Sequence, residues 1–75
     1  MAAQRIEIVA EMVAAVLQVG VGEGDPVAAG QEVVLLESMK MEIPVLAEHG
    51  GTVAEIKVAP GDVVQEGDVL VVLHP

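Results

Sequence analysis

Gly24-Asp25-Pro26-Val27-Ala28-Ala29-Gly30 recurs 37 positions later as Gly61-Asp62-Val63-Val64-Gln65-Glu66-Gly67. Each copy opens on Gly-Asp and closes on glycine, which are residues that favour turns, with valine between them. Chance could produce one such match, but the same offset also aligns the apolar positions on both sides of it. The chain is therefore predicted to hold two similar halves, at about residues 13–37 and 50–74. Each half reads as strand, Gly-Asp turn, short strand, glycine turn and apolar strand.

Alternating and continuous apolar runs indicate β-structure throughout the chain. The alternating residues expected to face inward are Ile6 and Ile8; Leu17, Val19 and Val21; Met41, Ile43 and Val45; and Ala54, Ile56 and Val58. The runs 33–36 and 69–73 are apolar without interruption, which predicts strands covered on both faces. A helix would fit only residues 9–17, a segment too short to be stable alone. The expected fold class is all-β, a sandwich in which each half covers the hydrophobic face of the other.

Composition excludes several classes of protein. The 75 residues form one domain, 1–75, with 12 acidic against 3 basic residues and a net charge of −9. A nucleic-acid binder needs a basic face, and a chain without cysteine has no disulfide or thiolate site. His49 and His74 stand alone, so no metal site is expected. The turns leave no room for an active-site loop, so we expect no catalytic residues and no enzyme.

Nothing in the sequence predicts export or membrane insertion. Glu7 and Glu11 interrupt the N-terminal apolar residues, so neither a secretory signal nor a membrane span fits there. A cytoplasmic protein that contacts neither membrane nor nucleic acid is expected.

The connection between the halves, residues 37–42, breaks the usual rules for a turn. An apolar strand precedes it and an alternating strand follows, so the chain must form a hairpin here, yet the residues are Glu-Ser-Met-Lys-Met-Glu. Hairpin turns favour Asn-Gly or Asp-Gly. One interpretation places Met39 and Met41 in the core, with Lys40 a solvated partner of acids. The repeat favours the other interpretation, in which all three lie at an exposed tip, as expected of a functional site.

Glu37-Ser38-Met39-Lys40-Met41, together with the two Gly-Asp turns, resembles the biotinyl/lipoyl attachment domain family. The chain is most similar to its small stand-alone members of the biotin carboxyl carrier type, from about Ile6 to Leu73. The resemblance implies a flattened barrel-sandwich of two four-stranded antiparallel sheets, related by a quasi-two-fold axis. It also implies that the modified lysine lies on the hairpin opposite the two termini.

By the same resemblance, Lys40 would be acylated by biotin, and Met39 and Met41 would present it to a biotin protein ligase. Glu37 would contribute to recognition by that ligase. The implied partners are the ligase, a biotin carboxylase and a carboxyltransferase, which passes the carboxyl group to an acyl-CoA or related acceptor. The carrier is expected to be monomeric in isolation. A lipoyl carrier is the less favoured alternative, since lipoyl domains typically show Asp-Lys-Ala at this hairpin. The second alternative is an interaction or regulatory module that carries no modification.

Overall fold

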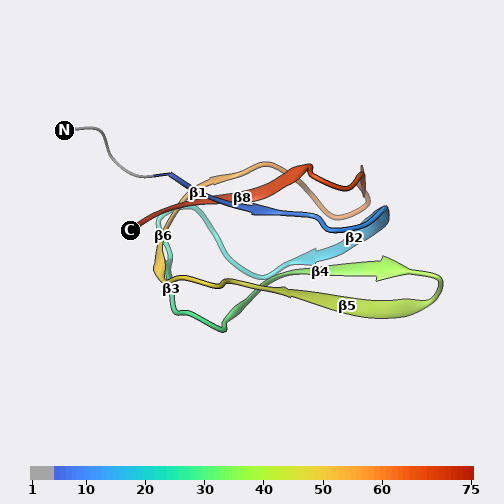
Figure 1. Cartoon of the computed structure of the whole chain (residues 1–75), viewed down its shortest axis with the longest axis horizontal. Helices are drawn as coiled ribbons and strands as arrows, with labels where there is room; N and C mark the ends of the chain where they lie inside the picture. The colour runs from blue at the N-terminus through green and yellow to red at the C-terminus, as the bar shows by residue number, and fades with distance from the viewer. Residues whose placement is uncertain (1–4) are drawn as a thin grey trace.

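The computed structural model describes residues 5–75, which form eight β-strands and no helix (Figure 1). The strands are β1 (Ile6–Val9), β2 (Ala14–Val19), β3 (Pro26–Val27), β4 (Glu32–Ser38), β5 (Met41–Leu46), β6 (Gly51–Ile56), β7 (Val63–Val64) and β8 (Val69–His74). They build two four-stranded antiparallel sheets, in the orders β1-β8-β6-β3 and β5-β4-β2-β7. The all-β fold class is confirmed. No helix within the described range could span a membrane.

A shift of 37 positions converts one sheet into the other. It carries β1 onto β5, β2 onto β6, β3 onto β7 and β4 onto β8, so the first sheet order becomes the second. The hydrogen bonds between turns and loops follow the same relation within residues 5–75. For example, the Val16 N–H donates to the Asp62 carbonyl at 2.8 Å, and the Val53 N–H donates to the Asp25 carbonyl at 2.9 Å. The shift of 37 positions also relates β1 to β5, which lie outside the two repeats predicted from the sequence.

The geometry of the two Gly-Asp turns explains why both glycine and aspartate occur there. Gly24 and Gly61 adopt φ angles of 89° and 96°, which are costly for residues with a side chain. The carboxylates of Asp25 and Asp62 accept hydrogen bonds from backbone N–H groups three residues earlier, at 2.7 and 2.9 Å. These bonds hold the turn that precedes each short strand. Each short strand then pairs with a strand of the other half, β3 with β6 and β7 with β2.

The core lies between the sheets and follows the same symmetry. Most buried residues have a buried counterpart 37 positions away: Ala10 and Ala47, Val16 and Val53, Val27 and Val64, Val33 and Leu70, Val34 and Val71, Leu36 and Leu73. Each sheet contributes its inner face, so neither half could bury its apolar residues without the other.

The structure corrects the inward-facing positions predicted for β2 and β6. Leu17 is 37% exposed, whereas its neighbour Val16 is 2% exposed. The register between β2 and β4 shifts between Val16 and Gln18, which marks a β-bulge at Leu17. A bulge inserts one residue and reverses the alternation, so the buried residue precedes the one expected. The same shift occurs on β6 between Val53 and Glu55, so Val53 is buried at 2% exposure where Ala54 was expected.

Candidate functional site

The hairpin between β4 and β5 turns through two residues in left-handed conformations. Ser38 pairs with Met41, and between them Met39 and Lys40 have φ angles of 53° and 65°. Positive φ at both central residues defines the type I′ turn, which normally selects Asn-Gly. A residue with a Cβ atom loses roughly 1–2 kcal/mol in this region. The fold therefore tolerates local strain at the tip where the methionine and the lysine stand.

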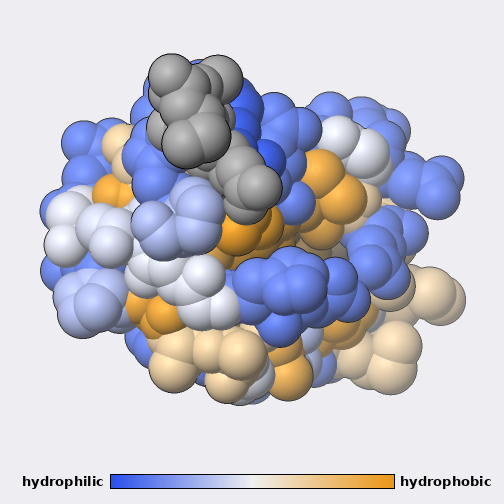
Figure 2. All heavy atoms as spheres, turned by 60° about the vertical axis from the view of Figure 1, so that its left-hand side comes forward, coloured by the Kyte–Doolittle hydropathy of each residue, from blue (hydrophilic) through white to orange (hydrophobic). Residues whose placement is uncertain are grey.

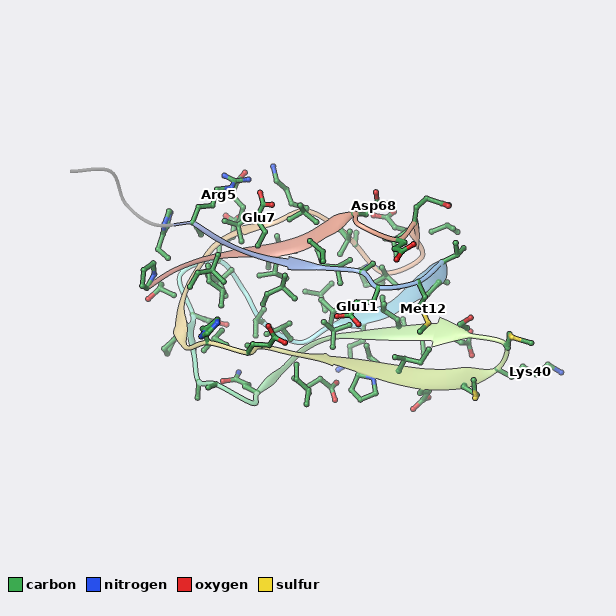
Figure 3. All side chains as sticks on the ribbon, in the orientation of Figure 1. Arg5, Glu7, Glu11, Met12, Lys40 and Asp68 are labelled. Carbon is green, nitrogen blue, oxygen red and sulfur yellow. The ribbon has the colours of Figure 1, made fainter. Side chains whose placement is uncertain are left out.

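The three tip residues lie outside the core. Met39 is 88% exposed, Met41 is 59% exposed, and Lys40 is also exposed. Figure 3 shows Lys40 at the end of the hairpin, pointing away from the body of the domain. Within residues 5–75 it makes no ion pair, so its ε-amine is accessible from solvent. The interpretation that buries the two methionines is wrong.

Glu37 lies near the tip on β4, directly opposite Glu42 on β5. Both side chains are exposed. Like charges directly opposite each other in an antiparallel pair are destabilising. The strand pair next to the tip therefore carries two like charges at opposed positions, which weakens this part of the hairpin. The sequence predicted a role for Glu37, and the register adds Glu42, whose pairing depended on the exact length of the turn.

The other two basic residues form an ion-pair cluster on the opposite sheet. The Arg5 guanidinium contacts Glu7 at 3.0 Å and Glu55 at 3.6 Å, and the Lys57 ammonium contacts Glu55 at 3.1 Å. The hydrogen bond and the charge of Lys57 lower the pKa of Glu55 below its ordinary value, with a smaller contribution from Arg5. Two of the three strong cations are thus engaged with acids, and the third is at the hairpin tip.

Other parts of the described surface offer no comparable site. Two cavities of about 120 and 170 Å³ lie between the edge strands β1 and β5, with mixed linings in which Val45 and Leu46 stand beside the carboxylate of Glu11. Figure 2 shows hydrophobic atoms in a hollow between hydrophilic side chains. Pockets for small molecules usually measure about 300–1,000 Å³. No group of three or more metal-ligating side chains gathers within residues 5–75.

Each residue that the sequence singled out thus lies at or beside one hairpin. Lys40 and Met39 form its turn, Met41 follows the turn, and Glu37 stands on the strand that leads into it. The hairpin lies at the end of the molecule away from the start of β1 and the end of β8 (Figure 1). This arrangement holds an amine at an exposed end of the domain, and within residues 5–75 neither a cavity nor a group of metal-ligating side chains lies beside it. It can present a group for reaction elsewhere.

Comparisons with known proteins agree with this description. The profile of the family described as biotin-requiring enzyme matches residues 4–73. The chain is 54% identical over 67 residues to the biotinylated protein TB7.3 homolog of Mycobacterium leprae, covering 89% of this chain and 94% of that one. It is 55% identical over 56 residues to the biotin/lipoyl attachment protein of Bacillus subtilis, covering 75% and 77%.

Solved structures contain the same fold. A single-chain, multi-domain long-chain acyl-CoA carboxylase superposes with a TM-score of 0.88 at 33% identity. The superposition covers 93% of this chain and 7% of that much longer one, so the similarity concerns one small part of it.

Proposed function

The chain belongs to the biotin/lipoyl attachment domain family, and from this premise we propose that it is a biotin carboxyl carrier whose Lys40 receives the biotin. It is a carrier and not an enzyme. A biotin protein ligase attaches the cofactor, and the loaded domain moves between a biotin carboxylase and a carboxyltransferase. The acceptor is an acyl-CoA or a related molecule. We place this cycle in the cytoplasm.

The observation that carries the proposal is the strained turn. Met39 and Lys40 occupy two left-handed positions that Asn-Gly would fill at lower cost, and both side chains are exposed. Neither packing nor an ion pair within residues 5–75 explains their presence. A requirement for reaction at the lysine does explain it. The exposed, unhindered ε-amine fits a long acyl group bound through an amide.

The residues around Lys40 do not activate it. An amine attacks an acyl donor only through a free lone pair, and no described side chain forms a hydrogen bond or ion pair with Lys40 that could take its proton. The ligase must therefore supply the base as well as the activated acyl donor. When the amide bond between Nζ and the biotin carboxyl carbon forms, the bond from that carbon to the donor's leaving group breaks, and the ammonium loses two of its three protons to the ligase and the leaving group. The formal net charge then falls from −9 to −10.

The domain supports the bound group by holding one end of a flexible arm. Biotin, when attached, supplies a ring nitrogen that accepts and releases a carboxyl group. The lysine stem extends from a rigid two-sheet body, so the arm moves while its base stays fixed. The acidic surface keeps carriers from associating with each other as they move between catalytic subunits. The chain's own residues thus bind and position, and the catalytic groups belong to the partners.

Mass spectrometry of the protein from its native host tests the proposal. We expect a biotinyl adduct on a peptide that contains Lys40, and no adduct on Lys57. The Lys40→Arg variant should lose streptavidin binding while its β-type circular dichroism is unchanged, and Lys57→Arg should keep both. A lipoyl adduct at Lys40 would support the lipoyl carrier instead. An unmodified protein from a host that expresses an active ligase would contradict both.

A further inference from the structure

The outer faces of the two sheets occupy equivalent positions but differ in their side chains. On the β1-β8-β6-β3 sheet, Val72 faces outward and lies between Glu7 and Glu55 on the neighbouring strands. It is nevertheless 0% exposed. Long charged side chains cover apolar neighbours with their stems while the charged groups remain in water. The ion-pair cluster of Arg5, Glu7, Glu55 and Lys57 is therefore the cover of this face.

The equivalent face of the hairpin sheet, β5-β4-β2-β7, has no such cover. Leu35, the counterpart of Val72, lies between Pro44 and Gln18 and is only half-buried. The counterpart of Lys57 is Gly20. Hydrophobic side chains remain exposed on and beside this face: Leu17 at 37%, Leu46 at 50% and Val63 at 67%. Since the same backbone carries a cover on the other sheet, its absence here is not imposed by the fold.

The two faces also carry different charged residues at equivalent positions. Arg5 on one face corresponds to Glu42 on the other, and His74 corresponds to Glu37. The hairpin face therefore ends, next to Lys40, in two carboxylates directly opposite each other. No lysine or arginine lies on this face in the described part of the chain, because Arg5 and Lys57 pair with acids on the other sheet. A cation there would have to come from another molecule.

We propose that the contact of the biotin protein ligase extends beyond Glu37 and the tip onto the outer face of the hairpin sheet, where Leu35, Pro44 and Glu42 form the surface on which the ligase docks. This inference rests on the proposed function. A ligase that acylates Lys40 must contact the tip, but Met39 and Lys40 alone offer little area for recognition. The strands β4 and β5 continue from the tip into this face without a break. The ligase supplies an apolar patch over Leu35 and Pro44, with arginine or lysine side chains between the two carboxylates.

Steady-state biotinylation of the apo-protein by a purified biotin protein ligase, with ATP and biotin, tests this surface. The informative variant is Glu42→Arg, which places on the hairpin face the residue found at its counterpart, Arg5. The matched control is Glu7→Arg on the opposite face, since both substitutions take the net charge from −9 to −7. Circular dichroism and thermal unfolding establish that each variant folds.

We expect Glu42→Arg to raise the KM for the apo-protein about tenfold with kcat nearly unchanged, because encounter and docking are weakened while the tip is intact. Glu7→Arg should leave both parameters within about twofold. The KM of the wild type should also rise with ionic strength, and that of Glu42→Arg should rise less. Equal KM values for the two variants would overturn the docking surface and leave the carrier function standing. Failure of the ligase to modify the wild type would overturn both.

Discussion

Replacing the hairpin tip by Asn-Gly, as Met39→Asn with Lys40→Gly, should make the domain more stable while abolishing its modification. The two residues hold φ angles of 53° and 65°, the values that type I′ turns require. Asparagine tolerates this region better than methionine, and glycine adopts it freely. The double variant therefore relieves strain at two successive positions without changing the path of the backbone.

The size of the gain follows from the exposure of the tip. Two residues with side chains in the left-handed region together destabilise the folded state by about 2–4 kcal/mol. The added glycine offsets about 0.5–1 kcal/mol of the gain, because it gives the unfolded chain more conformational freedom. Met39 is 88% exposed, so its removal costs little burial. We expect a net increase of about 1–2 kcal/mol in the free energy of unfolding. For a domain of this size that raises the Tm by roughly 4–8 °C per kcal/mol.

Thermal and urea unfolding, followed by circular dichroism, measure the change. Lys40→Gln is the control, because it removes the same charge but keeps a side chain at the strained position, and its stability should match the wild type. A double variant that folds and is no more stable than Lys40→Gln would refute the reasoning. It would mean that the turn is relaxed as it stands, or that the exposed side chains contribute to folding after all.

Three further substitutions probe the scaffold. Gly51→Ala should cost about 1–3 kcal/mol in urea unfolding, because the new Cβ would lie 2.5 Å from a backbone carbonyl oxygen of β8; an unchanged midpoint would show that β6 can move away. Val16→Ala should lower the free energy of unfolding by about 2 kcal/mol and Leu17→Ala by less than about 1 kcal/mol, since the bulge buries Val16 and exposes Leu17. The reverse order would mean that Leu17, as the sequence alternation predicted, faces the core. Lys57→Met should raise the pKa of Glu55 in an NMR titration, because Lys57 is the main cause of its lowering. The stabilisation that this ion pair gives the wild type is present above pH 4.5, the ordinary pKa, and is lost as the pH falls through the lower folded value; an unmoved titration would contradict the pairing.

Local signals allowed the sequence to predict the fold class and the exposed hairpin tip. The Gly-Asp turns depend on residues that specify their own geometry, and they fixed the offset of 37 between the halves. The hairpin tip was recognisable because Met-Lys-Met contradicts that same turn chemistry. Both inferences needed only residues close together in the chain.

Features that depend on sheet order were not predictable in this way. The bulge at Leu17 has no local signature, since valine and leucine are equally suited to a strand, and only the pairing with β4 shows which of two neighbours is extra. The ion-pair cluster joins β1 to β6 across β8, strands far apart in the chain. The acidic pair of Glu37 and Glu42 required the turn to be known as a two-residue loop.

The position of the site follows from the symmetry of the scaffold. The two equivalent halves are connected by one segment, the hairpin turn between β4 and β5. Within residues 5–75, no other turn between strands corresponds to it under the shift of 37 positions. The tip lies at the end of the molecule opposite the start of β1 and the end of β8, as Figure 1 shows. Met39 and Lys40 are exposed and pack against neither sheet of the described core, so strain, exposure and a cation without an ion pair can be maintained there without weakening that core.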